Sequence, residues 1–391
     1  MKDGWEIKTI GDICFVGGGS TPRRTEKAFW ENGTYPWFSI DDIRDQGRII
    51  TDTKQKITKL AWNKMRVFPA NSVLLCCTAS VGEYALSTIP ITSNQQFNGL
   101  TIKDHEQMLP MYLFYFCSTL KPVLQGLSGR ATIDFVSSEK VRQLRIPYPS
   151  LPEQQRIVDI LDREFAKIDA LKANAEKSLQ TAKDLFYQML SHTFSNPSWS
   201  WERIGDVFDT GAGGTPLKTY KEYYENGDIP WLRSGEVCRK YITETEMFIT
   251  QLGMDNSSAK MFPKNAVVVA MYGATAGQVG ILHLETTTNQ AVCGIFPRKN
   301  YVPEFIYYSL LNSKKGLVAQ ATGNAQPNIS QIKIKNTTIP VISREEQEEV
   351  VSRLDDLNDK CDTLQQNYQK TLTLCDDLKQ SLLRKAFNGE L

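Results

Sequence analysis

The sequence repeats itself once, at a distance of about 194 residues. Trp5, Ile10-Gly11-Asp12-Ile13 and Thr21-Pro22 return as Trp199, Ile204-Gly205-Asp206-Val207 and Thr215-Pro216. Later pairs are Pro36-Trp37 with Pro230-Trp231, Phe68-Pro69 with Phe262-Pro263, Asn94-Gln95 with Asn289-Gln290, and Ile146-Pro147 with Ile339-Pro340. The offset drifts by only about a residue, so both copies should share one fold. Each copy is long enough to bury its own core, which predicts two domains.

Each copy ends in a segment patterned as a long helix. Both segments begin with a capping-box signal, Ser150-x-x-Glu153 and Ser343-x-x-Glu346. Apolar residues then recur at steps of three and four, which is typical of a coiled-coil seam. The predicted seam consists of Leu161, Ile168, Leu171, Ala175, Ala182, Leu185 and Met189 in the first helix, and of Val350, Leu354, Leu357, Cys361, Leu364, Tyr368, Cys375, Leu378 and Leu382 in the second.

The two helical segments are predicted to pair with each other. A rod of about 60 Å carries more apolar surface than one domain needs for its own core, so the other helix is the simplest cover. Because domain and helix alternate along the chain, antiparallel pairing would place one domain at each end. The alternative is that each helix packs only on its own domain.

The remaining parts predict compact α+β domains. Short apolar runs such as Val73–Leu75 and Val267–Val269 indicate strands, and residues 109–126 and 303–317 indicate helices. The fold class is therefore α+β, with two pseudo-two-fold related domains separated by two long antiparallel coiled-coil helices. The boundaries are 1–151 for the first domain, 152–196 for its helix, 197–342 for the second domain and 343–391 for its helix.

The net charge of +1 hides an uneven distribution. Residues 1–151 carry 18 Lys and Arg against 14 Asp and Glu, and residues 197–342 carry 14 against 12. The helical segments are acidic instead, which leaves basic domains compatible with a nucleic-acid partner. No run of 18 apolar residues and no signal-peptide core is present, so we expect a cytoplasmic protein with no membrane partner. The eight cysteines form no C-x-x-C pair, which predicts reduced thiols and no metal site.

Catalytic motifs are weak. The run Gly211–Pro216 lacks the third glycine of a dinucleotide loop, and Gly273–Gly277 lacks the lysine and hydroxyl of a P-loop. Asn196-Pro197-Ser198-Trp199 faintly resembles the Asn-Pro-Pro-aromatic motif of adenine methyltransferases but has no second proline. The histidines, at 105, 192 and 283, have no repeated counterparts. We therefore expect a chain without catalytic residues.

Polar loops offer groups suited to phosphates and base edges. Arginine can pair with guanine, Asn or Gln with adenine, and Asp or Glu can accept from cytosine. Residues where the copies differ would then read different sequences. The alternative for any one of them is a solvated surface residue. The candidates are Thr21, Arg23, Arg24, Lys27, Ser39, Asp41, Arg44, Arg130 and Thr132 in the first copy, and Thr215, Lys218, Lys221, Arg233, Ser234, Asn324 and Gln326 in the second.

Several motifs taken together resemble the specificity subunit of type I restriction-modification enzymes. They are Thr-Pro after glycines, Gly-x-x-Pro-Trp, Asn-Gln-x-x-x-Gly, the run Ile146–Gln155 before a long helix, and the run Leu382–Leu391. The resemblance covers essentially the whole chain. One departure is that residues 343–347 read Ser-Arg-Glu-Glu-Gln where the first copy has Leu-Pro-Glu-Gln-Gln.

The resemblance implies a non-catalytic scaffold with two target recognition domains. Each domain would read one part of a split site in double-stranded DNA, with much of the readout at residues 23–60 and 217–255. Two methyltransferase subunits and two restriction subunits would assemble on it, and these would bind S-adenosylmethionine, ATP and Mg²⁺, so that the chain itself holds no cofactor. Two rivals stay open, namely a DNA adenine methyltransferase with unrecognised motifs and a coiled-coil adaptor for proteins alone.

Overall fold

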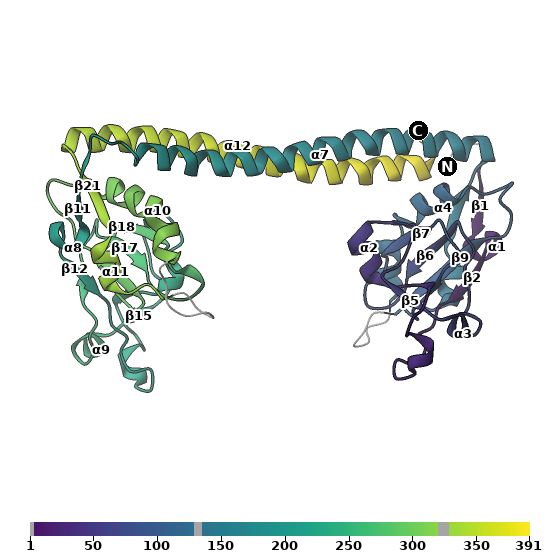
Figure 1. Cartoon of the computed structure of the whole chain (residues 1–391), viewed down its shortest axis with the longest axis horizontal. Coiled ribbons are helices and arrows are strands. Elements are labelled where there is room, and N and C mark those ends of the chain that lie inside the picture. The colour runs from purple at the N-terminus through teal and green to yellow at the C-terminus, as the bar shows by residue number, and fades with distance from the viewer. Residues whose placement is uncertain (1–3, 129–134, 320–327) are drawn as a thin grey trace. The chain divides into compact units, whose positions relative to one another are not determined.

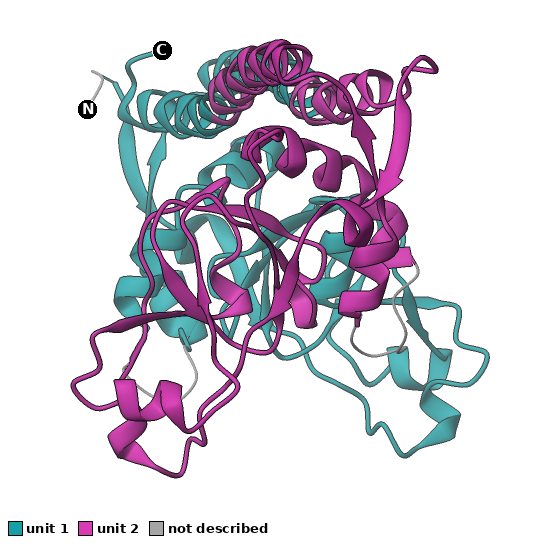
Figure 2. Cartoon of the chain, turned by 90° about the vertical axis from the view of Figure 1, so that its left-hand side faces the viewer, with its two compact units in different colours: residues 1–176, 370–391 teal, residues 177–369 magenta. Residues whose placement is uncertain are grey.

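The computed structural model describes residues 4–128, 135–319 and 328–391. The chain divides into two compact units, shown in separate colours in Figure 2. Unit 1 combines Met1–Glu176 with Lys370–Leu391, and unit 2 is Lys177–Gln369. Each unit therefore contains one globular part and a portion of both long helices.

Unit 1 is built on a five-stranded sheet with a smaller sheet beside it. The larger sheet has the order β2 (Cys14–Gly18), β9 (Phe97–Ile102), β6 (Ser72–Cys76), β7 (Tyr84–Ser87), β4 (Ile49–Ile50). The smaller one has the order β5 (Gln55–Ile57), β3 (Tyr35–Phe38), β8 (Thr92–Ser93), and β1 (Glu6–Thr9) pairs with β10 (Arg145–Tyr148). The predicted run Val73–Leu75 lies in β6, the central strand, whose residues are all buried.

Unit 2 repeats this topology, with a fourth strand in its smaller sheet. Its larger sheet has the order β12 (Thr210–Ala212), β20 (Val292–Ile295), β17 (Val267–Ala270), β18 (Val279–Leu282), β14 (Tyr241–Ile242). The second sheet has the order β15 (Phe248–Ile249), β13 (Ile229–Leu232), β19 (Thr286–Thr288), β16 (Met261–Phe262), and β11 (Ser200–Arg203) pairs with β21 (Thr338–Val341). The α+β prediction and the shared fold of the two copies are confirmed.

Short helices complete each unit. In unit 1 these are α1 (Ile10–Ile13), α2 (Ile40–Gln46), α3 (Lys59–Trp62), α4 (Pro110–Cys117), α5 (Lys121–Leu127), α6 (Ser138–Arg142) and the 3-10 turn η1 (Lys27–Phe29). In unit 2 they are α8 (Ile204–Val207), α9 (Gln251–Asp255), α10 (Pro303–Ala319), α11 (Gln331–Asn336) and the turns η2 (Lys221–Tyr223), η3 (Ser234–Glu236) and η4 (Gly273–Thr275).

The helix predicted over 109–126 is broken, whereas its counterpart α10 is continuous. Pro122 explains the difference. Proline has no N–H, and in a continuous helix its ring would clash with the carbonyl of Ser118. The chain instead leaves the helical path after Cys117 and restarts at Lys121.

The long helices are α7 (Leu151–Thr193) and α12 (Arg344–Asn388), against predicted spans of 152–196 and 343–391. Within unit 1 they run antiparallel. Arg156 Nη2 donates to the Leu391 carbonyl at 2.7 Å, Asp169 pairs with Lys379, and Lys172 Nζ lies 2.8 Å from Asp376. Residue numbers therefore increase along α7 in the direction in which they decrease along α12.

The same helices also pack on the globular part of each unit. In unit 1, Leu161 and Leu383 join a core with the aromatic residues of α4, and in unit 2 Phe186 and Val350 join the core containing Phe305. Figure 1 shows the helices next to α4 in unit 1 and next to α10 in unit 2. Helix pairing and packing on the domain are therefore not alternatives but occur together.

Part of the predicted seam is wrong. Leu161, Ile168, Ala175, Ala182, Val350, Leu354, Cys361 and Cys375 are buried, and Leu357, Tyr368 and Leu382 are half-buried. Five predicted seam residues are exposed instead, namely Leu171, Leu185, Met189, Leu364 and Leu378. In α7 the buried stripe continues through Ala182, Phe186 and Leu190. A straight helix has 3.6 residues per turn, so a strict seven-residue count drifts off the buried face by about 20° per heptad.

A buried glutamine fixes the first turn of each long helix. Gln154 accepts from the Leu109 N–H at 2.9 Å and donates to the carbonyls of Gln107 at 2.9 Å and Pro149 at 3.0 Å. Gln347 makes the equivalent bonds to Val302, Asn300 and Ile342 in unit 2. Neither glutamine is exposed. The second start signal also caps α12, since Ser343 Oγ accepts from the Glu346 N–H at 3.1 Å.

Candidate nucleic-acid interface

Each unit carries an outer lobe, residues 20–69 in unit 1 and residues 214–263 in unit 2. Figure 1 shows α3 and α9 of these lobes on the side of each unit away from the long helices. Small aromatic cores stabilise the lobes, with Trp37 and Trp30 in the first and Trp231 and Tyr224 in the second. The lobes contain most of the residues predicted to contact DNA.

The Thr-Pro loop is joined to the Asn-Gln turn in both units. In unit 1 the Thr21 hydroxyl donates to Gln95 Oε1 at 2.5 Å, and in unit 2 the Thr215 hydroxyl donates to Gln290 Oε1. The ring N–H groups of Trp37 and Trp231 donate to the carbonyls of Ser20 and Gly214. Two repeated motifs about 74 residues apart in the sequence thus form one local structure.

Glycine is required where these two segments meet. A Cβ on Gly19 would lie 2.2 Å from Ser93 Oγ, and one on Gly213 would lie 2.0 Å from Thr288 Oγ1. Gly214 is equally close to the backbone of Ala259. The glycines of the run Gly211–Pro216 therefore serve close packing of the chain.

Arg24 is held in a fixed position on the surface of lobe 1. Its guanidinium lies 4.0 Å from the ring centroid of Trp30 and 4.6 Å from that of Trp37. Its Nη1 also donates to Gln55 Oε1 at 2.7 Å. A guanidinium held in this way loses little side-chain entropy when its remaining N–H groups form a bidentate contact with guanine or phosphate.

Arg23 and Lys27, like Arg24, are exposed. Arg23 projects from the same loop, and its carbonyl accepts from the Trp30 ring N–H at 3.1 Å. Lys27 lies in η1 and forms an exposed ion pair with Glu31 at 3.3 Å. Such exposed pairs are weak, so Lys27 can exchange its partner for a phosphate at little cost.

The lobe of unit 2 (lobe 2) has the same scaffold as the lobe of unit 1 (lobe 1), but different side chains at its tip, residues 217–221. Lys218 and the exposed Lys221 stand at the positions of Arg24 and Lys27. Leu217 replaces Arg23 and is 62% exposed, and Tyr220 replaces Glu26 and is 46% exposed. Over the whole lobe, residues 20–69 hold ten Lys and Arg against six Asp and Glu, while residues 214–263 hold six against seven. Lobe 1 is therefore basic, and lobe 2 is more apolar and slightly acidic.

A second candidate group lies at the base of each lobe. Ser39 is buried, and its N–H donates to Asp42 Oδ2 at 2.8 Å at the start of α2. The other Asp42 oxygen accepts from the Lys54 N–H at 2.7 Å. Burial raises the pKa of Asp42, and these two backbone donors oppose the rise. The Asp42 carboxylate therefore joins the start of α2 to the segment around Lys54 within the lobe.

Glu236 has the same role in unit 2, where it accepts from the N–H groups of Arg233 and Glu246. The Arg233 side chain pairs with Glu236 and with Glu246. Arg233 is thus neutralised by two carboxylates, unlike Arg24. Ser234 follows in η3 and, with Arg233, lines a hollow of about 810 Å³.

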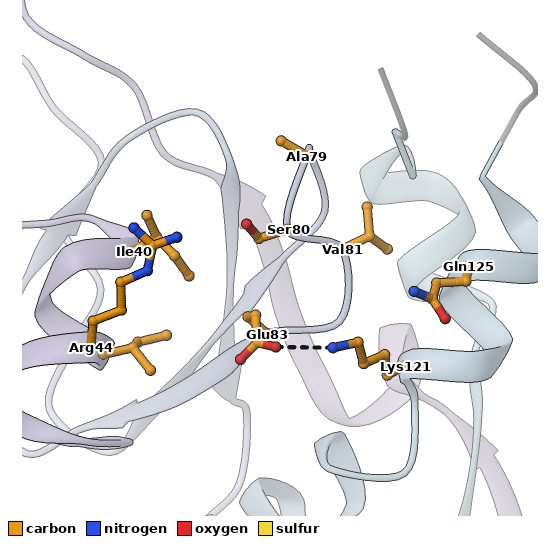
Figure 3. Close-up of a pocket in the computed structure, with 9 residues that line it drawn as sticks. Ile40, Arg44, Ala79, Ser80, Val81, Glu83, Lys121 and Gln125 are labelled. Carbon is orange, nitrogen blue, oxygen red and sulfur yellow. Dashed lines mark hydrogen bonds and ion pairs between the residues drawn. The ribbon is translucent and has the colours of Figure 1, made fainter. Parts of the chain in front are cut away.

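Arg44 and Asp41 lie on α2 and form an ion pair at 3.1 Å. Arg44 also lines a hollow of about 320 Å³, with Ile40 from the same helix on one side and Lys121 and Gln125 of α5 on the other (Figure 3). Glu83 lies between and pairs with Lys121 at 3.2 Å and with Arg48 at 2.7 Å. Burial raises the pKa of Glu83, but these two cations outweigh it and the pKa is lowered overall.

The predicted residues Arg130, Thr132, Asn324 and Gln326 lie outside the described residues. The residues that follow these two segments are described. Phe135 forms a β-bridge with Thr78, and Asn328 forms one with Tyr272. Phe135 and Asn328 therefore each pair with the turn that follows the central strand of the large sheet.

The sequence prediction did not include the glutamines that bond to Thr21 and Thr215. Gln95 and Gln290 belong to a repeated motif, but only the fold places them beside Thr21 and Thr215. Their repetition at exposed positions was the available signal, since a core role cannot account for it. The supporting roles of Gln55 and Trp30 around Arg24 had no such signal.

Neither metal ligands nor a membrane span is found in the described part of the chain. No group of three or more His, Cys, Asp or Glu side chains there could hold a metal ion. No helix described by the structure has the length and hydrophobicity to cross a bilayer.

Exposed leucines of the predicted seam lie on both long helices in each unit. In unit 1 the pairs Lys172–Asp376 and Asp169–Lys379 place Leu171 at the level of Leu378. Both are about half exposed. In unit 2 the counterparts Leu364 and Leu185, each offset by 193 residues, are exposed at 40% and 39%. Exposed leucines at equivalent sequence positions thus recur in both units.

Comparisons with known proteins agree with this architecture. The model of the type I restriction modification DNA specificity domain matches twice, at residues 2–181 and 198–374. The MjaIX specificity subunit of Methanocaldococcus jannaschii is 26% identical over 99% of this chain and 93% of its own length. The EcoprrI specificity subunit of Escherichia coli is 28% identical over 99% and 94%.

Two solved structures share the fold. One chain comes from a structure on complex assembly and conformational transition of the type I R-M system, with a TM-score of 0.82, 20% identity, and coverage of 100% of this chain and 99% of that one. The other is the HsdS subunit from Thermoanaerobacter tengcongensis, with a TM-score of 0.65, 18% identity, and coverage of 100% and 98%.

Proposed function

Because the chain belongs to the type I restriction modification DNA specificity domain family, we propose that it is the sequence-recognition subunit of a type I restriction-modification complex. Unit 1 and unit 2 each read one part of a bipartite, asymmetric site in double-stranded DNA. The observation that carries the proposal is one scaffold used twice, with different tips. Thr21 and Thr215 make the same hydrogen bond, whereas Arg23 and Leu217 occupy equivalent exposed positions.

The chain acts as a scaffold without catalytic residues, in the cytoplasm where the DNA lies. It binds no cofactor itself. S-adenosylmethionine belongs to two methyltransferase subunits, and ATP and Mg²⁺ to two restriction subunits. The backbone of the glycine run supports this division. The N–H groups of Gly213 and Gly214 donate to the carbonyls of Val292 and Thr288, so they are not available to a phosphate.

The exposed leucine pairs support docking of two copies of one partner. Leu171 with Leu378 in unit 1 and Leu185 with Leu364 in unit 2 are apolar, exposed and repeated. Exposed apolar residues that recur in this way indicate a protein interface. We assign them to the two methyltransferase subunits.

Binding selection on purified complexes tests the recognition role. The chain is coexpressed with its methyltransferase subunit and used to select from a pool of random duplexes. We expect enrichment of a site with two specified parts separated by an unspecified gap. A complex that binds DNA without sequence preference would favour the coiled-coil adaptor, and methyl transfer by the isolated chain would favour the methyltransferase alternative.

The docking assignment has its own test. Leu378→Lys and Leu185→Lys should each reduce methyltransferase subunits bound per chain from two towards one, measured by native mass spectrometry. Leu374→Lys, which also changes an exposed leucine of α12 but has no leucine at the equivalent position Thr181, is the matched control. Retention of two partners by both variants would refute the assignment.

The paired helices also set the gap between the two parts of the site. Removing seven residues from each helix shortens it by about 10 Å. The selected gap should then shrink, and an unchanged gap would show that the helices do not determine it.

A further inference from the structure

Gln95 and Gln290 are repeated, exposed and outside every core cluster. Exposed residues of an internal repeat are free to diverge, as Arg23 and Leu217 have done. Asn71 and Asn265 are repeated because both have positive φ. No positive φ is recorded at Gln95 or Gln290, so backbone conformation does not explain their identity.

The hydrogen bonding around each glutamine, in the part of the chain that the structure describes, leaves two N–H groups without a partner. The Thr21 hydroxyl occupies Gln95 Oε1, and the Thr215 hydroxyl occupies Gln290 Oε1. Among the described residues, neither the side-chain Nε2 nor the backbone N–H of either glutamine has a partner. The amide orientation is thus set by a threonine, and the free N–H groups can donate to an acceptor.

The turn that carries each glutamine is held firmly. Asn94 Oδ1 accepts from the Gln96 N–H at 3.0 Å, and Asn289 Oδ1 accepts from the Ala291 N–H at 3.2 Å. The Ser20 N–H donates to the backbone carbonyl of Ser93 at 2.8 Å, and the Gly214 N–H donates to the backbone carbonyl of Thr288 at 2.8 Å. The donors are therefore presented in the same way in both units.

We propose that Gln95 and Gln290 each bind a DNA phosphate, and that this contact sets the register of its unit on its half of the site. The inference rests on the proposed function. Two halves that read different bases share only the sugar-phosphate backbone, and phosphate contacts position a protein without specifying sequence. A donor pair that is identical in both units matches the shared group, whereas the divergent lobe tips match the bases.

Uncharged donors make this contact distinct from that of a lysine. A lysine on phosphate releases counterions, so its loss lowers the salt dependence of binding. Loss of a glutamine contact weakens binding at every salt concentration while leaving that slope unchanged. The Gln95→Ala variant should bind the complete site about tenfold more weakly, as expected for one hydrogen bond to a charged group.

The test uses the complex of the full chain with its methyltransferase subunit. Methylphosphonates, which lack the phosphate charge, are placed one at a time along the selected site. The wild-type complex should lose affinity when one particular phosphate in each half of the site is replaced. The Gln95→Ala complex should tolerate the replacement in the half read by unit 1, and the Gln290→Ala complex should tolerate the one in the other half. Gln143→Ala, an exposed glutamine of unit 1 without a repeated partner, should retain both sensitivities.

The Thr21→Val variant tests whether Thr21 acts by orienting the Gln95 amide or by stabilising the fold. It should reproduce most of the Gln95→Ala loss, and the double variant should be no weaker than Gln95→Ala alone. Unfolding midpoints of all variants should match the wild type. A changed base preference in Gln95→Ala, unchanged affinity, or methylphosphonate sensitivity equal to wild type would each overturn the inference. A wild-type complex without sequence preference would instead overturn the proposed function.

Discussion

Phe387 of α12 packs edge-on against Tyr112 of α4, with ring centroids 5.2 Å apart. Both belong to the core of unit 1, together with Trp5. Phe194 of unit 2 stacks on Phe305 at 5.6 Å in the equivalent place. The core of the first domain is therefore completed by a residue from the other end of the sequence.

Phe387→Ala should destabilise unit 1 by about 3–5 kcal/mol, since a large aromatic side chain leaves a cavity when it is removed from a packed core. Hydrogen exchange should rise across α4 and β6 and remain unchanged in β17. Phe194→Ala is the mirror control and should affect unit 2 instead. Equal exchange in both units after either change would contradict the division.

Gln154→Leu should lower the free energy of unfolding by about 3 kcal/mol, measured by urea titration. The change removes three hydrogen bonds and leaves buried backbone groups of Leu109, Gln107 and Pro149 without partners. Gln155→Leu, one residue along on the exposed face, should have an effect below about 0.5 kcal/mol. Similar losses for both would show that the buried bonds contribute little.

Arg24 and Lys27 should give different binding phenotypes. Arg24→Ala removes a guanidinium fixed by Trp30 and Gln55 and should relax base preference in one half of the site only. Lys27→Ala should weaken binding to all duplexes alike and reduce the slope of log affinity against log salt by about one. Selection from random duplexes and salt titration would distinguish them. A reversal of the two phenotypes would contradict the assigned contacts.

The apolar tip of lobe 2 predicts contact with thymine methyl groups. Leu217 and Tyr220 are exposed where lobe 1 has Arg23 and Glu26, and apolar side chains read the methyl of thymine in the major groove. Replacing a contacted thymine by deoxyuridine in the half read by unit 2 should weaken binding about fourfold. Leu217→Ala should abolish that difference. Indifference of the wild type to deoxyuridine throughout this half would exclude such contacts.

Much of the fold could be predicted because the sequence contains an internal repeat, so that each motif can be compared between two copies. The Pro-Trp repeat lies on β3 and β13, and the apolar runs at Val73 and Val267 form the central strands. The strand order could not be predicted, because it depends on pairings such as Ile49 with Leu86 that leave no trace in local sequence. The long helices were predicted within a few residues at each end.

The seam was only partly predictable. Counting in heptads identified Ala175 and Cys361, but it also included Leu185 and Leu378, which are exposed. The sequence shows that a leucine is apolar. Whether a neighbouring helix or domain covers it depends on the direction in which it points, and this direction rotates around the helix axis along the length of the helix. The phosphate-directed glutamines were missed for a related reason, since the Thr21 hydroxyl that orients Gln95 comes from 74 residues away.

Unit 1 includes Lys370–Leu391 as well as the first 176 residues. This division constrains how new specificities can arise by recombination between genes of the family. A crossover that imports only a foreign first half also sets that half's α4 against the resident Leu383, Ala386 and Phe387. Viable hybrids should therefore preserve the fit at this junction, even while the lobe tips vary without restraint.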